Sequence, residues 1–100
     1  LRGKAEVISR IIPENRLIVR AAKEIEADVV TDQDSYNWTK ISSLRAYLAK
    51  DSIDEKSLFT RIVNALSEGD CATASDLQVE MYDKVEELKS LYAAYRQNMI

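Results

Sequence analysis

The amino-acid sequence predicts an all-α protein, a bundle of four or five helices with a long C-terminal helix. Only two of the 100 residues are glycine and one is proline, whereas a sheet protein needs such turn residues every ~8–12 positions. The most frequent residues, among them Ala, Leu, Glu and Lys, favour helix. Apolar residues also recur three and four positions apart along most of the chain, which is the spacing of one helical face. A chain of this length supports one core, so we expect a single domain over residues 1–100.

Pro13 separates the first two predicted helices, which cover residues 3–12 and 14–29. Their apolar faces consist of Leu1, Ala5, Ile8 and Ile12 in the first helix and Leu17, Ile18, Ala21, Ala22, Ile25 and Val29 in the second. Proline has no N–H group and disfavours helical geometry in the residue before it. A new helix with Pro13 in its first turn is therefore the simpler interpretation, and one continuous, kinked helix is the alternative.

A polar run at residues 31–35 predicts a loop, in which Asp34 or Ser35 caps the following helix. That helix is expected over residues 36–50, with an apolar stripe formed by Trp38, Ile41, Leu44, Tyr47 and Leu48. Ser52 and Glu55 have the spacing of a capping box, so the next helix is expected over residues 53–67. Its inward side chains are predicted to be Leu58, Phe59, Ile62, Val63 and Leu66.

Gly69 is predicted to end this helix in the left-handed conformation, and Asp70 to cap the last helix. The last helix runs from Cys71 to about Met99. It would be ~42 Å long, whereas the earlier predicted helices reach only ~15–24 Å. Its apolar residues alternate steps of four and three, as in the heptad seam of a coiled coil; they are Met81, Val85, Leu88, Tyr92, Tyr95 and Met99.

The end of this seam is the candidate binding site. Because the last helix is expected to extend beyond its neighbours, its apolar strip needs a cover. A second chain is one candidate, either another copy or a different protein, and the partner-binding residues are then Leu88, Tyr92, Tyr95, Arg96 and Met99. The alternative cover is the first helix, folded along the strip through Ile8 and Ile12.

Composition argues against most catalytic chemistry. The sequence has no histidine and one cysteine, Cys71, so it lacks a Ser-His or Cys-His nucleophile pair, a thiolate-rich zinc site and an intrachain disulfide. An acidic cluster at residues 24–34 lacks the glycine and the terminal glutamate of a calcium-binding loop. No apolar run approaches the ~20 residues of a membrane span. We therefore expect no enzyme activity, cofactor, metal or membrane contact; the remaining catalytic hypothesis is an arginine-rich helical enzyme built on Arg10, Arg16 and Arg45.

Charge is unevenly distributed along the chain. The net charge is −3, but residues 1–23 hold six basic and two acidic side chains. Arg16, Arg20 and Lys23 share one helical edge that is suited to nucleic acid or an acidic partner. The pI near 5.0 nevertheless differs from the values above ~9 that are usual for nucleic-acid modules.

These observations together favour a non-enzymatic protein–protein interaction or assembly module that uses its long C-terminal helix and is oligomeric. A nucleic-acid-associated or regulatory protein with a basic N-terminal helical face is the alternative. The unpaired Cys71 and the lack of an export signal in the first residues favour a cytoplasmic location.

Overall fold

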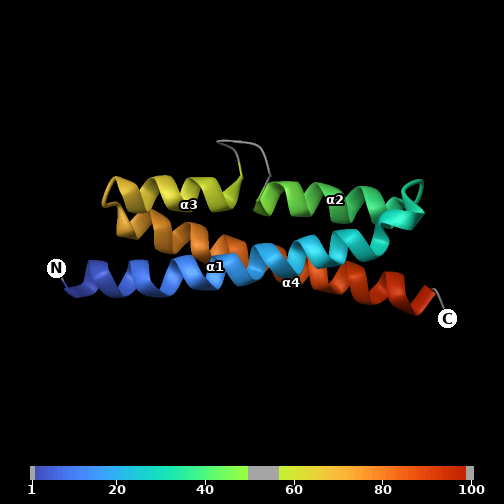
Figure 1. Ribbon diagram of the computed structural model, residues 1–100, viewed down its shortest axis with the longest axis horizontal. Helices are drawn as coiled ribbons and strands as arrows, with labels where there is room; N and C mark the ends of the chain where they lie inside the picture. Colours follow the sequence, from blue (N-terminus) through green and yellow to red (C-terminus); the bar gives the residue numbers. More distant parts are fainter. Residues whose placement is uncertain (1, 50–56, 99–100) are drawn as a thin grey trace.

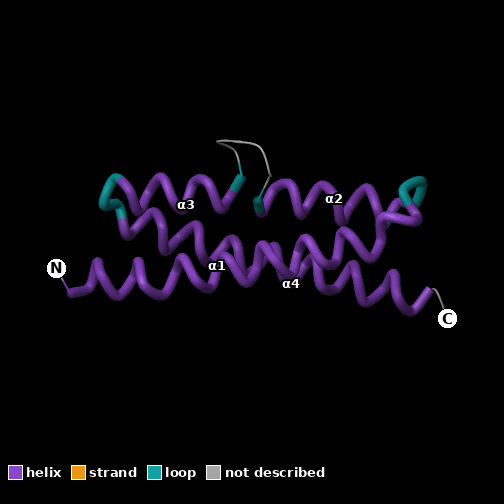
Figure 2. Tube along the Cα trace, in the orientation of Figure 1, coloured by secondary structure: helices purple, strands orange, loops and turns teal. Residues whose placement is uncertain are grey.

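A computed structural model describes residues 2–49 and 57–98, with side chains from residue 9 onward. These residues form four α-helices and one short 3-10 turn (Figure 2). The elements are α1 (Arg2–Val29), η1 (Val30–Asp32), α2 (Tyr36–Leu48), α3 (Leu58–Ser67) and α4 (Cys71–Asn98). No strand occurs in the described ranges, so the predicted all-α class is confirmed.

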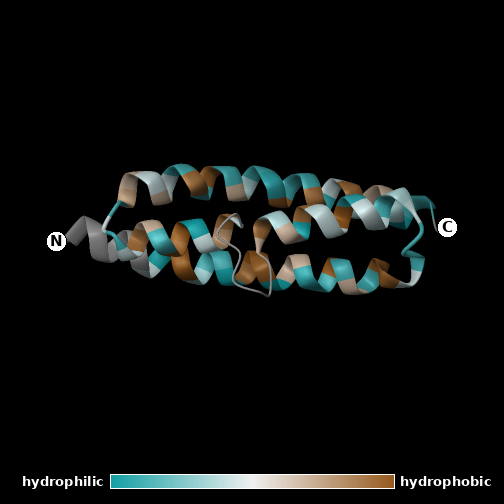
Figure 3. Cartoon of the chain, turned by 90° about the horizontal axis from the view of Figure 1, so that it is seen from above, coloured by the Kyte–Doolittle hydropathy of each residue, from teal (hydrophilic) through white to brown (hydrophobic). Residues whose placement is uncertain are grey.

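The helices form an elongated bundle of three rows, 52 × 23 × 16 Å in extent (Figure 1). Helices α1 and α4 run in the same direction along the whole length, while α2 and α3 lie end to end in a third row that runs the opposite way. Seen from above, the α2/α3 row lies between α1 and α4 (Figure 3). The opposite side of the α1/α4 pair therefore has no helix of the described chain packed over it.

Helix α1 is continuous, and the prediction that a new helix starts at Pro13 is wrong. Pro13 lies inside a helix of 28 residues, as the alternative interpretation required. Its side chain is exposed, while Ile11 and Asn15 on either side are buried. Water can replace the one hydrogen bond that proline removes at an exposed position, and core packing holds both halves of the helix in line.

Because α1 continues through Pro13, the predicted helix lengths also change. With 28 residues each, α1 and α4 are both ~42 Å long at ~1.5 Å per residue. The last helix is therefore long, as predicted, but the expectation that it is longer than every earlier helix is wrong, because α1 has the same length.

Helix α2 begins as predicted. The Ser35 hydroxyl accepts a hydrogen bond from the Trp38 N–H at 3.0 Å, so Ser35 rather than Asp34 is the cap. Helix α3 is shorter than expected: it begins at Leu58, behind Ser57, whose hydroxyl accepts from the Thr60 N–H at 3.4 Å. The predicted capping box of Ser52 and Glu55 lies outside the described residues.

The turn between α3 and α4 confirms the predictions for Gly69 and Asp70. Gly69 has a φ of 80°. Its N–H donates to the Leu66 carbonyl at 3.1 Å, and the Asp70 N–H donates to the Ala65 carbonyl at 2.8 Å; these two bonds are those of a Schellman motif. The Asp70 carboxylate then accepts a hydrogen bond from the Thr73 N–H at 3.1 Å and so caps α4. The turn at Gly69 places α4 antiparallel to α3.

The core runs the length of the bundle. It includes the predicted side chains Leu58, Ile62 and Leu66 of α3, and it continues through Ile11, Ala22, Val29, Ile41, Leu48, Met81, Leu88 and Tyr95. Several predicted core residues are only half-buried, namely Trp38, Leu44, Tyr47, Phe59 and Val63. Leu17 differs most, since it is 65% exposed. Ile18 packs against the core in place of Leu17.

Candidate interaction surfaces

The apolar strip at the end of α4 is covered largely from within the chain. Leu88 and Tyr95 are buried, at 0% and 4% exposure. Tyr92 is half-buried, and its hydroxyl donates to the Asp28 carboxylate near the end of α1. Helix α1 thus lies along the strip, although at its C-terminal end rather than through Ile8 and Ile12.

Tyr92 and Arg96 retain accessible surface at this end. The Arg96 guanidinium donates to the Tyr92 hydroxyl at 3.0 Å and lies 3.9 Å from Asp28. The rings of Tyr92 and Tyr95 stack with their centres 6.5 Å apart. The structure therefore brings Tyr92 and Arg96 together at Asp28 and buries Leu88 and Tyr95 in the core. Met99 lies outside the described residues.

The three arginines of the catalytic hypothesis lie on different sides of α1. Arg45 is buried, 3.8 Å from Glu26 of α1, and its guanidinium also donates to the Ala49 carbonyl at 3.1 Å. Arg10 lines a pocket next to α4, and Arg16 is exposed. Within the described residues, no three His, Cys, Asp or Glu side chains gather in a group that could hold a metal ion.

A groove of about 480 Å³ lies between α2 and α4. Its walls are Tyr36, Thr39, Lys40, Ser43, Leu44 and Tyr47 from α2, with Glu80, Lys84 and Glu87 from α4. The three α4 residues are spaced by four and three, so they follow one flank of that helix.

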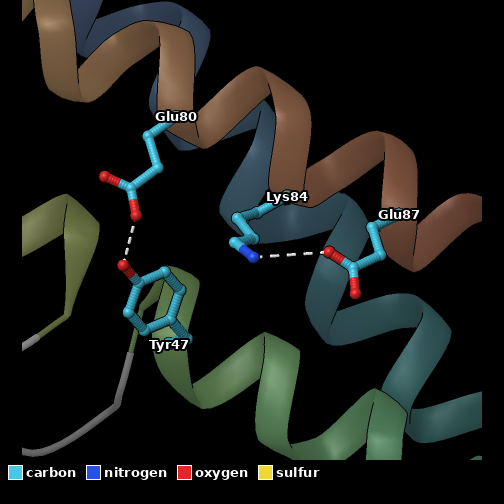
Figure 4. A network of polar contacts seen from close by, with 4 residues as sticks. All are labelled: Tyr47, Glu80, Lys84 and Glu87. Atoms are coloured by element: carbon cyan, nitrogen blue, oxygen red, sulfur yellow. Dashed lines mark hydrogen bonds and ion pairs between the residues drawn. The ribbon is translucent and has the colours of Figure 1, made fainter.

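The polar groups of this groove contact one another (Figure 4). The Tyr47 hydroxyl donates to the Glu80 carboxylate, and the Lys84 ammonium lies 3.4 Å from Glu87. Lys84 also lies 5.9 Å from the centre of the Tyr47 ring, a cation–π distance. The hydrogen bond to Glu80, together with burial, raises the pKa of Tyr47, so this hydroxyl holds its proton at neutral pH. The network thus links α2 to α4 through a neutral tyrosine and paired charges.

The second surface lies between α1 and α4. A pocket of about 250 Å³ is lined there by Arg10, Glu14, Ser75, Gln78, Val79 and Tyr82. The Tyr82 hydroxyl donates to the Glu14 carboxylate, and this bond is the main reason that the pKa of Tyr82 is raised. The contact joins the two parallel helices and places residue 14 of α1 beside residue 82 of α4.

Large apolar side chains surround this pocket on the outside. Val79 is 60% exposed and Tyr82 is 43% exposed, and they are one turn apart on α4. The exposed Leu17 lies one turn beyond Glu14 on α1, which puts it on the same side of the helix pair. We call Arg10, Glu14, Leu17, Val79 and Tyr82 the α1/α4 patch.

Sequence reasoning did not find this patch. The heptad seam of α4 passes through Met81, Val85 and Leu88, and Val79 and Tyr82 lie beside it. The sequence did contain a signal for this patch. The heptad seam already supplies the apolar residues that face the core, so large apolar residues beside the seam are expected on the surface.

Comparison of the chain with protein-family models, with curated proteins and with solved structures found no match. None of the helices in the described part of the chain carries an apolar stretch long enough to cross a bilayer.

Proposed function

We propose that the protein is a non-enzymatic protein-interaction or assembly module whose main contact is the long helix α4. The observation that carries this proposal is the exposure of three large apolar side chains on one side of the α1/α4 pair. Val79 and Tyr82 line the pocket there, and Leu17 lies one turn beyond the pocket residue Glu14. Single exposed apolar residues are ordinary, whereas a group of them beside polar residues is typical of a binding surface. A cytoplasmic location is part of the same proposal.

The proposal centres on α4 because this helix contributes to both surfaces. Val79 and Tyr82 belong to the α1/α4 patch, and Glu80, Lys84 and Glu87 line the groove toward α2. At the far end of the helix, Tyr92 and Arg96 add an accessible aromatic and an accessible cation. Tyrosine and arginine are enriched at protein interfaces, since both combine apolar surface with hydrogen-bonding groups.

Photo-crosslinking tests this function. A benzophenone amino acid replaces Leu17 in the patch, and in a matched control it replaces Ala27, which is exposed on the outer side of the same helix. We expect irradiation in cells to attach another polypeptide, of any identity, at position 17 and not at position 27. Equal or absent crosslinking at the two positions would show that the patch is ordinary surface.

The alternative is nucleic-acid binding through the basic face of α1. Arg16, Arg20 and Lys23 are exposed, which supports it. Arg20 lies 3.9 Å from Glu24, and this acidic neighbour weakens the local positive potential. Titration with duplex DNA at increasing salt tests the alternative, because phosphate contacts produce a steep loss of affinity with salt.

A further inference from the structure

We propose that the first part of α1, residues 2–12, is a cover that detaches from α4 while the rest of the bundle stays folded. Pro13 is the hinge of this movement. The inference concerns a movement within one chain, so it goes beyond the proposed interaction function and does not depend on it. Its basis is a group of weak features that coincide where α1 passes Pro13.

Pro13 weakens the connection between the two parts of α1. It has no N–H group, so α1 lacks one backbone hydrogen bond at this point, and a proline ring crowds the preceding helical turn. In the closed bundle, packing holds the two parts in line. When the packing of one part is lost, the helix bends at a proline more readily than elsewhere. The two parts of α1 therefore separate at Pro13 at a lower cost than at other positions.

The two parts of α1 are packed unequally. Before Pro13, the structure describes the side chains of residues 9–12, and of these only Ile11 is fully buried, while Ile12 is partly buried. The part after Pro13 packs on the core over its whole length, through Ile18, Val19, Ala22, Ile25 and Val29. Loss of the first part therefore removes much less apolar contact than loss of the second part.

Polar contacts also anchor the second part of α1. Glu26 lies 3.8 Å from the buried Arg45 of α2, and Asp28 accepts a hydrogen bond from Tyr92 of α4. The other end of α1 projects past the turn between α3 and α4 (Figure 1). The first residues of α1 thus extend beyond the helix against which the rest of the cover packs.

Helices α1 and α4 are incompletely packed at the level of Pro13. The pocket of about 250 Å³ lies there, with Arg10 and Glu14 of α1 on one wall and Ser75 and Gln78 of α4 on the other. Space between two helices removes the dispersion contacts that a filled interface supplies. The cover therefore gains less from its contact with α4 than a fully packed helix would.

Two buried amides make the closed arrangement costly. Gln78 is 5% exposed and Asn15 has no exposure, and within the described chain neither amide has a partner in hydrogen-bonding geometry. A buried amide without a partner is unfavourable, because it has lost its hydrogen bonds to water and gained none. Gln78 shares the pocket with α1, so detachment of the cover returns its amide to water. Unwinding that continues two residues past Pro13 hydrates Asn15 as well.

Detachment changes the surface that α4 presents. A helix shorter than ~12–15 residues is marginal in water when isolated, so residues 2–12 unfold when they leave α4. The α4 wall of the pocket is then open to solvent beside Val79 and Tyr82. The cover thus determines how much of α4 is accessible next to the α1/α4 patch.

Amide hydrogen exchange of the full chain, followed by NMR at neutral pH, tests the proposal. The first four N–H groups of a helix have no helical acceptor, so the protected amides of the cover are those of residues 6–12. We expect them to exchange together, with one common protection about tenfold or more below that of residues 18–29. Protection that declines gradually toward the N-terminus would indicate fraying, and protection equal to that of residues 18–29 would indicate one cooperative unit. Either result would overturn the proposal.

Two substitutions test the physical cause. Pro13→Ala restores the missing hydrogen bond and should raise the protection of residues 6–12 by about tenfold or more. Gln78→Met replaces the amide on the facing helix with an unbranched apolar side chain and should raise the same protection by about tenfold. The matched controls, Arg16→Ala on α1 and Asp76→Asn on α4, change exposed residues and should leave this protection unchanged.

The response to Gln78→Met separates detachment from fraying. The substitution lies on α4, so it slows exchange in α1 only if exchange requires α1 to leave α4. Circular dichroism should show the helicity of the native chain in each variant. If neither Pro13→Ala nor Gln78→Met slowed the exchange of residues 6–12, the hinge and the buried amide would not govern the movement, and the proposal would be wrong.

Discussion

Asn15 is an unusual residue in this core. Its side chain has no solvent exposure, and neither atom of its amide has a hydrogen-bond partner in the described chain. A buried amide without partners costs about 1–3 kcal/mol of stability. We expect Asn15→Leu, whose side chain has the same branching and the same number of non-hydrogen atoms, to raise the free energy of unfolding by about that amount in chemical denaturation.

The conservative variant Asn15→Asp serves as the comparison, because it adds a buried charge and should destabilise the protein strongly. A lower stability of Asn15→Leu would contradict this expectation, and it is the result expected if the amide bound an enclosed water through its hydrogen bonds. The α1 helix would then carry a hydrated site at the position next to Glu14.

Gly69 is the one described residue that requires a left-handed backbone. A Cβ atom is disfavoured there, so we expect Gly69→Ala to lower the free energy of unfolding by about 1–2 kcal/mol. The neighbouring substitution Ser67→Ala, inside α3, is the control and should have a small effect. A stabilising Gly69→Ala would mean that α3 continues into α4 without the Schellman turn.

At the scale of the elements, the hydrogen bond from Tyr47 to Glu80 links α2 to α4. Tyr47→Phe removes it and should lower the stability by about 1 kcal/mol at neutral pH. Because the folded-state pKa of Tyr47 is raised, the folded protein holds this proton more tightly than the unfolded chain. The contribution is therefore fully present below the ordinary pKa of 10.0 and is lost as the pH rises through the higher folded value.

Thermal unfolding of both proteins between neutral and alkaline pH measures this effect. The melting temperatures of the native chain and Tyr47→Phe should converge above pH 10. Tyr36→Phe is the control, because the Tyr36 side chain is exposed and its ring contacts Lys40 rather than a carboxylate. A constant difference across the pH range would show that the Tyr47 hydroxyl does not depend on Glu80.

The ends of the helices show which elements the sequence could predict. Ser35, Gly69 and Asp70 act through bonds to backbone groups only a few residues away, so local sequence was sufficient to place them. Pro13 was misjudged because its effect depends on burial. At an exposed position flanked by buried residues, packing outweighs the lost hydrogen bond, and packing is not a local property.

The candidate site could not be predicted from the sequence for the same reason, since it too depends on packing between distant parts of the chain. Leu17 and Ile18 both fit an apolar spacing of three or four with later residues of α1, and the spacing alone does not tell which of them faces inward. The fold resolves this, because the α4 helix on one side and the α2/α3 row on the other select Ile18. The exposure of Leu17, and with it the α1/α4 patch, is thus a consequence of tertiary structure.

At the scale of the whole molecule, α1 and α4 pack against each other. Both have 28 residues, and contacts between them occur near the middle of α1, at Glu14, and near its end, at Asp28. The α2/α3 row covers only one side of this pair. The bundle is therefore long and thin. At each end, the stability of the bundle depends on the few side chains that pack there.

Truncation at the C-terminal end of α4 tests whether the stability of the bundle depends on the side chains that pack there. A chain ending at Lys89 loses Tyr95, which is buried in the core, and Tyr92, whose hydroxyl contacts Asp28. Removal of one large buried aromatic residue typically costs about 3–5 kcal/mol. In a domain of this size, that loss lowers the melting temperature by more than about 10 °C. We therefore expect clear destabilisation in a thermal melt followed by circular dichroism.

A chain ending at Arg96 is the matched control, since it keeps both tyrosines and the contact with Asp28. Its melting temperature should stay close to that of the full chain. If the chain ending at Lys89 melted at the same temperature as this control, Tyr92 and Tyr95 would contribute nothing to folding. The end of α4 would then be free to serve a partner, as its sequence alone had suggested. The expected loss of stability instead assigns these tyrosines to the folding of the bundle and leaves the α1/α4 patch as the surface proposed for interaction.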